Sequence, residues 1–84
     1  MEFSRGQIVK SCAGHDKDTF LVVLKVEGKY AYISDGKSRK LENPKKKSLK
    51  HLKPTNTHID LADCTNRKLR SVLNSKLSEL TVTN

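Results

Sequence analysis

The run of residues 19–26 constrains the fold more than any other part of this 84-residue chain. It reads Thr-Phe-Leu-Val-Val-Leu-Lys-Val, an almost unbroken series of β-branched, aromatic and apolar residues. A half-exposed strand alternates apolar with polar residues, whereas a continuous run is typical of a strand with little solvent on either face. We therefore expect residues 19–26 to form a buried strand at the centre of a sheet.

Shorter strand signals surround this run and are separated by residues that favour turns. Gly28 supplies a turn before the next segment, and Asp35-Gly36 is a strong two-residue hairpin signal. Proline cannot donate a backbone hydrogen bond, so Pro44 is expected to end a strand and Pro54 to close the β region. The further strands predicted are at residues 6–10, 30–33, 39–41 and 48–52.

Five short strands joined by tight turns fit a small closed or nearly closed barrel, and an SH3-like barrel is the natural candidate at this length. The predicted fold class is therefore mostly β, with residues 1–54 forming the barrel. Residues 55–84 are predicted to be a C-terminal extension of the same domain. The chain is too short to support a second domain.

The C-terminal extension carries the spacing of an amphipathic helix, predicted over about residues 66–80. Its apolar residues recur at helical intervals, so that they form one stripe. That stripe consists of Leu69, Val72, Leu73, Leu77 and Leu80. Thr65 or Asn66 can cap its start. We expect the stripe to pack on the barrel; the alternative is a helix that docks on a partner.

The charge of the chain is concentrated in one segment. The net charge is +8, and residues 37–53 alone account for +7. Such a density repels itself and is usually compensated by an anionic partner, most commonly a phosphate backbone. A solvated lysine face and an anionic membrane surface are the alternatives. The membrane surface is less favoured, because the segment lacks an amphipathic helix that could enter lipid.

Composition excludes several classes of protein. Hydrophobic residues make up 35% of the chain, and no apolar run approaches the roughly 18 residues that a membrane span needs. Residues 1–6 contain no hydrophobic signal region, which favours a cytoplasmic location. The carboxylates are scattered and no nucleophile has a pocket behind it, so we expect neither an enzyme nor a cofactor.

Cysteine and histidine residues offer a second possible function. Cys12 and His15 lie three apart, and His58 and Cys64 lie near the other end of the predicted barrel. Zinc sites favour short paired spacings of these residue types, although the second spacing here is long. The alternatives are two small reduced thiols within the fold, or a disulfide between Cys12 and Cys64.

Aromatic residues are few. Tyr30 and Tyr32 alternate with core positions, so that packing within the barrel and stacking on nucleobases are both open to them. With so few aromatics, we expect phosphate contact and recognition of RNA shape, rather than reading of single-stranded bases, to be the main mode of binding.

Two stretches of the sequence resemble a known family. Residues 6–18 followed by 20–23 resemble the KOW motif, although Asp18 stands where that motif usually has a second glycine. Residues 32–36, 39–47 and 49–52 are similar to small bacterial KOW-domain RNA-binding proteins, which are related to KOW-type proteins of the archaeal and eukaryotic large ribosomal subunit. The resemblance implies an SH3-like barrel that binds ribosomal RNA or a ribosome-associated RNA. It leaves the chain after Thr55 uncovered.

The sequence thus predicts a non-catalytic RNA-binding module, with the ribosome or a ribosome-associated protein as further partners. Arg39 is the best candidate for a bidentate phosphate contact, because its planar fork matches two oxygens. A protein-interaction module, docking through the barrel or the helix, is the alternative function. The predicted RNA-binding residues are Lys37, Arg39, Lys40, Lys45, Lys46, Lys47, Lys50, His51 and Lys53, with His15 and Lys17 from the KOW loop.

Overall fold

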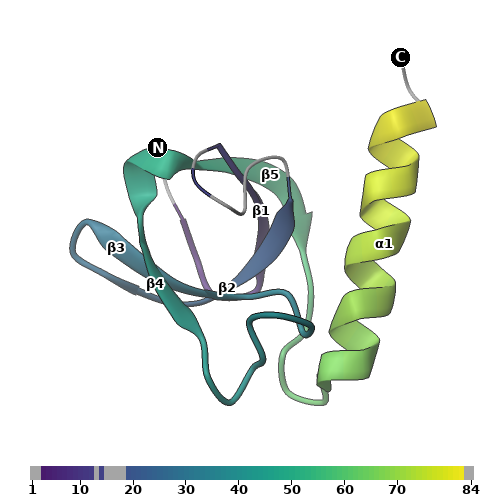
Figure 1. The fold of residues 1–84 in the computed structure, drawn as a ribbon, viewed down its shortest axis with the longest axis horizontal. Coiled ribbons are helices and arrows are strands. Elements are labelled where there is room, and N and C mark those ends of the chain that lie inside the picture. Colours follow the sequence, from purple (N-terminus) through teal and green to yellow (C-terminus); the bar gives the residue numbers. More distant parts are fainter. Residues whose placement is uncertain (1–2, 13, 15–18, 83–84) are drawn as a thin grey trace.

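The protein is a five-stranded antiparallel sheet followed by one long helix (Figure 1). The computed structural model describes residues 3–12, 14 and 19–82, with side chains as far as Ser75. The elements are β1 (Gln7–Ser11), β2 (Phe20–Glu27), β3 (Tyr30–Ser34), β4 (Lys45–Ser48), the 3-10 helix η2 (Leu49–His51), β5 (Leu52–His58) and α1 (Asn66–Val82).

The strands form one sheet in the order β4-β3-β2-β1-β5. All neighbouring pairs are antiparallel, with Val22 opposite Ile8 on one side and Ser34 on the other. Among the described residues, β4 and β5 each have a single neighbour and do not pair with each other. The predicted mostly β fold with a C-terminal helix is therefore confirmed, and closure of the sheet into a barrel is not.

The strand predicted at residues 39–41 was wrong in position. Residues 39–41 are part of a loop, and the three lysines at 45–47, which no predicted strand included, form most of β4. The predicted two-residue turn at Asp35-Gly36 is also wrong. Asp35 and Gly36 both donate backbone hydrogen bonds to the Arg39 carbonyl, at 2.9 and 3.1 Å, which closes a wider turn. Because of this wider turn, the next strand, β4, begins only after Pro44.

The end of the β region was also misplaced. Residues 49–51 form η2 instead of a strand, and β5 continues through Pro54 to His58. Proline is tolerated there because β5 is an edge strand. No further strand of the described chain pairs with its outer side, so the N–H that Pro54 lacks is not needed for a hydrogen bond there. Pro54 therefore does not close the sheet.

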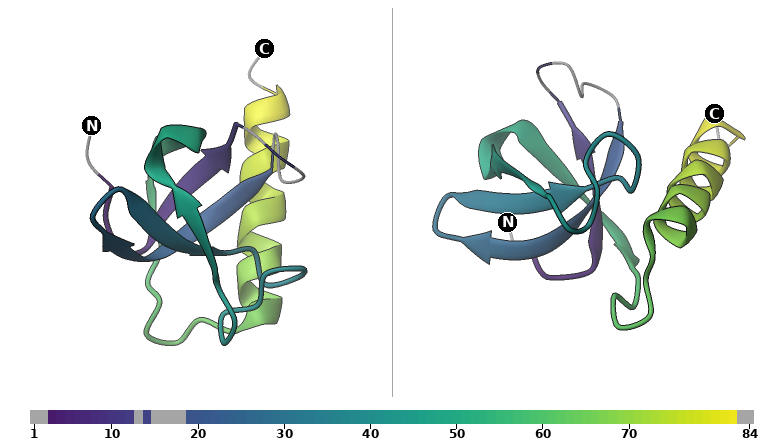
Figure 2. Two further views of the ribbon diagram at one scale, coloured as in Figure 1. Left: turned by 60° about the vertical axis from the view of Figure 1, so that its left-hand side comes forward. Right: turned by 60° about the horizontal axis from the view of Figure 1, so that its bottom comes forward.

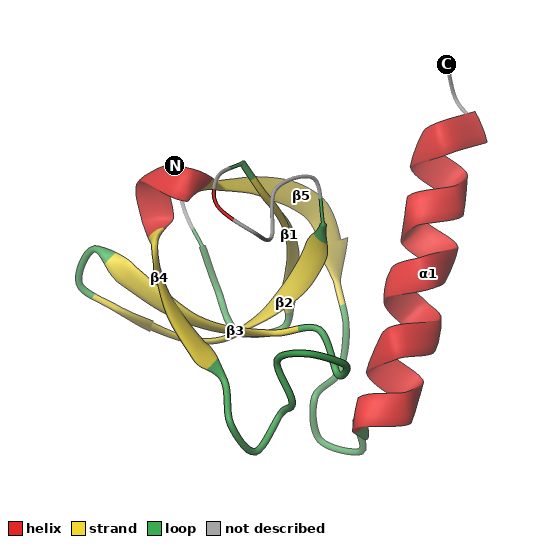
Figure 3. Cartoon of the chain, viewed as in Figure 1, coloured by secondary structure: helices red, strands yellow, loops and turns green. Residues whose placement is uncertain are grey.

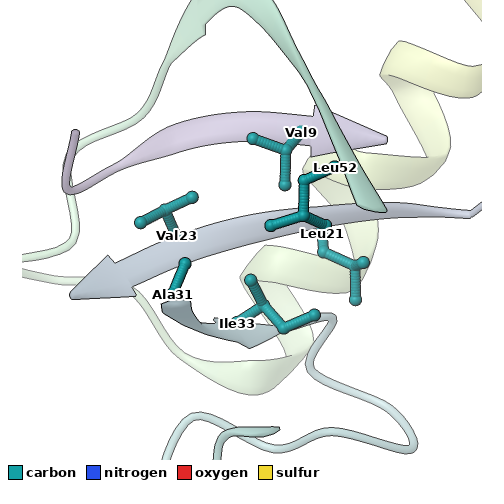
Figure 4. Packing of buried hydrophobic residues seen from close by; sticks show 6 residues of the cluster. All are labelled: Val9, Leu21, Val23, Ala31, Ile33 and Leu52. Carbon is teal, nitrogen blue, oxygen red and sulfur yellow. The ribbon is translucent and has the colours of Figure 1, made fainter. Parts of the chain in front are cut away.

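The sheet is curled (Figure 3), and two hydrophobic clusters lie on its opposite faces. The inner cluster consists of Val9, Leu21, Val23, Ala31, Ile33 and Leu52 (Figure 4). The outer cluster consists of Ile8, Phe20, Val22, Leu69 and Leu73. Successive residues of a strand point to opposite faces, so the continuous apolar run of β2 fills both clusters. Its predicted burial on two faces is confirmed at residues 20–23.

Helix α1 begins where the sequence predicted. The Thr65 hydroxyl accepts a hydrogen bond from the Lys68 backbone N–H at 3.1 Å, so Thr65 is the N-cap. Leu69 and Leu73 of the predicted stripe are buried against the sheet, and Val72 is half-buried. This half of the stripe therefore packs on its own domain. Within the described part of the chain, no helix combines the length and the apolar character needed to cross a membrane.

The side chain of Asn66 joins the start of α1 to the loop before β4. Its Oδ1 accepts a hydrogen bond from the Leu41 backbone N–H at 2.8 Å, and its Nδ2 donates to Glu42 Oε1 at 2.7 Å. This hydrogen bond from Asn66, followed by a backbone hydrogen bond and the charge of Lys40, lowers the pKa of Glu42 below its ordinary value of 4.5. The ionised carboxylate therefore helps to hold the loop against the helix.

We expect the thermal stability of the protein to depend on Glu42 above pH 4.5. Because the folded-state pKa is depressed, the ionised form stabilises the fold above the unfolded-state pKa, and this contribution is lost as pH falls through the folded-state value. Glu42→Gln should therefore have a lower Tm than the wild type near neutral pH, with a difference that shrinks in acid. Thermal denaturation from neutral to acidic pH measures this difference in Tm, with Asp63→Asn as the control. A Tm difference independent of pH would contradict it.

Candidate nucleic-acid interface

The segment 37–53, which carries most of the net charge, is distributed over several elements of the fold. Residues 37–40 lie in the loop between β3 and β4, residues 45–47 in β4, and residues 50–53 in η2 and β5. The exposed cations are Lys37, Lys40, Lys46, Lys50 and Lys53. Arg39, Lys45 and His51 are half-buried, and Lys47 is buried. The predicted residues His15 and Lys17 lie outside the described part of the chain.

The three consecutive lysines of β4 do not form one surface. Lys45 and Lys47 pair with Ile33 and Ala31 of β3, whose side chains belong to the inner cluster. Lys46 pairs with Tyr32, which points to the outer face. Paired residues of antiparallel strands share a face. Lys46 is consequently the one lysine of β4 that is directed outward.

Among the described residues predicted to bind phosphate, Lys47 is the most enclosed, with 9% of its surface exposed. Its aliphatic stem lies beside Ala31. Its Nζ reaches the loop between β1 and β2, where it lies 3.8 Å from the position that a Cβ on Gly14 would occupy. Long basic side chains often bury the stem in this way and direct the ammonium group to the edge of the core.

Arg39 has a structural part in the β3–β4 loop. Its carbonyl oxygen accepts backbone hydrogen bonds from Asp35 and Gly36, and the Ser34 hydroxyl also donates to it. The Arg39 backbone N–H donates to Asp35 Oδ1 at 2.8 Å. The turn therefore fixes the backbone from which the half-buried guanidinium extends.

The outer face of β3 and β4 combines aromatic and basic side chains. The Lys46 ammonium lies 4.6 Å from the centre of the Tyr30 ring, which is within cation–π range. Tyr30 is 45% exposed and Tyr32 is half-buried. Lys25 of β2 stands opposite Tyr32 and forms an ion pair with Glu27 at 3.4 Å.

Strand register adds a cation that the sequence analysis missed. Lys10 of β1 lies directly opposite Lys53 of β5. The Lys10 ammonium also lies 6.0 Å from the centre of the Phe20 ring. The Cys12 backbone N–H donates to the His51 carbonyl at 2.8 Å, which holds η2 beside the end of β1. The sequence contains no local signal for this pairing, because register is set by contacts between distant segments.

A groove of about 380 Å³ lies between the β3–β4 loop and α1. Lys37 and Arg70 line it, together with Asp35 and the ring of Phe20. Arg70 was not predicted, because its position next to the β3–β4 loop depends on how the helix docks. Lys37 of the segment 37–53 and Arg70 of α1 therefore lie close together at this groove.

The alternative metal site is not assembled in the described part of the chain. Cys12 and Cys64 are both free and half-buried, so the alternative of a disulfide between them is wrong. The Nε2 atom of His58 lies 2.9 Å from the Ser4 hydroxyl. No three His, Cys, Asp or Glu residues among those described are grouped to hold a metal ion. The fourth predicted ligand, His15, lies outside the described residues.

No ion pair joins an exposed lysine of the segment 37–53 to a carboxylate among the described residues, although the charge of Lys40 acts on Glu42. The ion pair between Lys25 and Glu27 lies outside that segment. Apart from the action of Lys40 on Glu42 and the contact of Lys46 with the Tyr30 ring, the charge of these exposed lysines is open to solvent or to an anion from outside the chain.

Comparison with known proteins assigns neither a family nor a function to the chain. No protein-family model matches the chain, and no curated protein sequence matches it significantly.

Proposed function

We propose that the protein is a non-catalytic RNA-binding module of the KOW type, which acts in the cytoplasm on ribosomal RNA or a ribosome-associated RNA. The observation that carries this proposal is the group of five exposed lysines in the segment 37–53 that form no ion pair with described carboxylates. Unpaired cations at this density favour a polyanion, and binding gains free energy from the counterions that they release.

The curvature of the sheet supports the SH3-like part of the proposal. Strands β1, β2, β3 and β5 all contribute side chains to the inner cluster, so the sheet wraps around one core (Figures 3 and 4). A small sheet that curls in this way approaches a barrel even where its two edge strands are not hydrogen-bonded. The resemblance of residues 6–18 to the KOW motif points to the same fold.

The alternative is a protein-interaction module that docks through the barrel or the helix. Burial of Leu69 and Leu73 against the sheet makes these two leucines unavailable to a partner. We therefore favour RNA and retain protein docking as an outcome of the test.

We expect RNA affinity to fall steeply with salt, and the dependence to weaken in a Lys40/Lys50/Lys53→Ala variant. Each phosphate contact that is lost should reduce the log–log slope by about 0.7–0.9, so three contacts should reduce it by about 2–3. The measurement is binding of the wild type and the variant to ribosomal RNA fragments across a salt series. Duplex DNA of equal length shows whether RNA shape is recognised.

The control variant is Lys29/Arg67/Lys68→Ala, which removes the same charge from exposed residues outside the segment 37–53. It should leave the slope nearly unchanged. Equal flattening in both variants would mean that net charge alone drives binding. If the wild type does not bind RNA at low salt, or the slope does not change, the protein-interaction alternative takes precedence.

A further inference from the structure

The outer face of the sheet carries two tyrosines that neither hydrophobic cluster includes. Tyr30 and Tyr32 lie two residues apart on β3, with Lys46 opposite Tyr32 on one side and Lys25 on the other. We call these four residues the tyrosine platform. Side chains two apart on a strand are about 7 Å apart and point the same way. The platform therefore presents two aromatic rings on one face, and Tyr32 stands between the two cations.

Helix α1 leaves this part of the sheet open. It packs on Ile8, Phe20 and Val22, at the β1–β2 part of the outer face. The turn between β2 and β3, next to Tyr30, lies on the opposite side of the molecule from the helix (Figures 1 and 2). With 45% of its surface exposed, Tyr30 is one of two large hydrophobic residues that remain exposed in the described chain, and the other is Val26.

We propose that the tyrosine platform stacks on unpaired nucleobases, so that the RNA bound by this module includes a single-stranded segment. This inference rests on the proposed function and names the kind of RNA that it takes. Stacking of bases on sheet aromatics is a general mode of single-strand binding, because every base has a π face. Lys46, 4.6 Å from the Tyr30 ring centre, holds its ammonium where the phosphate of a stacked nucleotide can reach it.

Glu27 limits where the RNA backbone can pass. It stands opposite Tyr30 and forms the 3.4 Å ion pair with Lys25, which compensates part of the charge on that side of the platform. Lys46 has no carboxylate partner among the described residues. The phosphates accordingly pass along the β4 side of the platform, where Lys46 stands. From the sequence alone, contact with bases is expected to play a minor part in RNA binding. The two tyrosine rings, which share one face of β3, give that contact a defined position.

The composition of the chain makes the platform directly observable. Its two tyrosines both belong to the platform. In a proton–carbon NMR spectrum, every tyrosine ring signal therefore reports on it, and Tyr30→Leu assigns the two sets of signals. With a single-stranded RNA oligonucleotide, the ring signals should shift upfield through the ring currents of the bases. Inorganic polyphosphate, which has the charge but no bases, should leave that upfield shift absent.

Binding measurements complete the test. Tyr30→Leu and Tyr32→Leu should each weaken single-stranded RNA binding about 5- to 100-fold without changing the salt slope. Tyr30→Phe and Tyr32→Phe keep the aromatic ring and should restore the affinity. Thermal denaturation confirms that each variant is folded.

The two proposals fail in different ways. If the wild type binds no RNA, both are overturned. If it binds RNA with the expected salt slope, but the tyrosine signals do not shift upfield and the leucine variants bind normally, the tyrosine platform is wrong while the proposed function stands.

Discussion

Gly36→Ala should lower the free energy of unfolding by about 2–5 kcal/mol. Gly36 has a φ of +75°, a backbone conformation that is costly for a residue with a Cβ atom. A Cβ at this position would overlap the Asn66 carbonyl oxygen and lie 3.2 Å from the Asn66 carbonyl carbon. Because both neighbours are backbone atoms, the loop before β4 or the start of α1 would have to move.

Gly28→Ala is the matched control for this prediction. Gly28 has a φ of +60°, but a Cβ there meets nothing within 4 Å. This variant should therefore lose only the backbone term, about 1–2 kcal/mol. Urea denaturation of the wild type and both variants gives the comparison. Equal losses in the two variants would show that the approach of the loop to the helix contributes nothing to stability.

Leu69→Ala should cost about 2–5 kcal/mol, a large share of the roughly 4–13 kcal/mol expected for a domain of this length. Leu69 is fully buried between α1 and the outer face of the sheet, in the cluster with Ile8, Phe20 and Val22. Truncation removes apolar contacts and leaves a cavity that the two layers can close only in part. The helix should lose its docking before the sheet unfolds.

The control for Leu69→Ala is Ser71→Ala, an exposed position of the same helix. It should change the free energy of unfolding by less than about 0.5 kcal/mol. Circular dichroism during urea denaturation measures both variants. If Leu69→Ala is as stable as Ser71→Ala, the helix does not depend on its contact with the sheet, and docking of the leucine stripe on a partner regains support.

Local patterns in the sequence predicted the elements that depend on local physics. The apolar run of β2 and the leucine spacing of α1 each determine which faces must be buried, so both elements were located correctly. Strand β4 was missed, because three lysines in succession are typical of a solvated connection. The backbone of β4 instead pairs with the edge of β3 that β2 leaves free, and Lys47 buries its stem beside Ala31. That outcome depends on pairing between segments that the sequence does not reveal.

The candidate site was predictable in composition but not in arrangement. Clustering of charge identified residues 37–53, yet alternation along β4 divides Lys46 from Lys45 and Lys47. The pairing of Lys10 with Lys53 across β1 and β5 depends on tertiary contacts, as does the position of Arg70 at the groove. The sequence could show that Tyr30 and Tyr32 share a face, whereas their exposure depends on where the helix packs.

The edges of the sheet have a consequence for self-association. An exposed edge strand offers unpaired backbone groups to a second copy of the chain, and this is a common route to aggregation. A copy that paired with the free edge of β4 would have to bring its own lysines against this charged strand, and like charges placed opposite each other repel. At the other edge, Pro54 removes one donor from β5. The charge of β4 at one edge and Pro54 at the other would thus both disfavour edge-to-edge pairing of two copies.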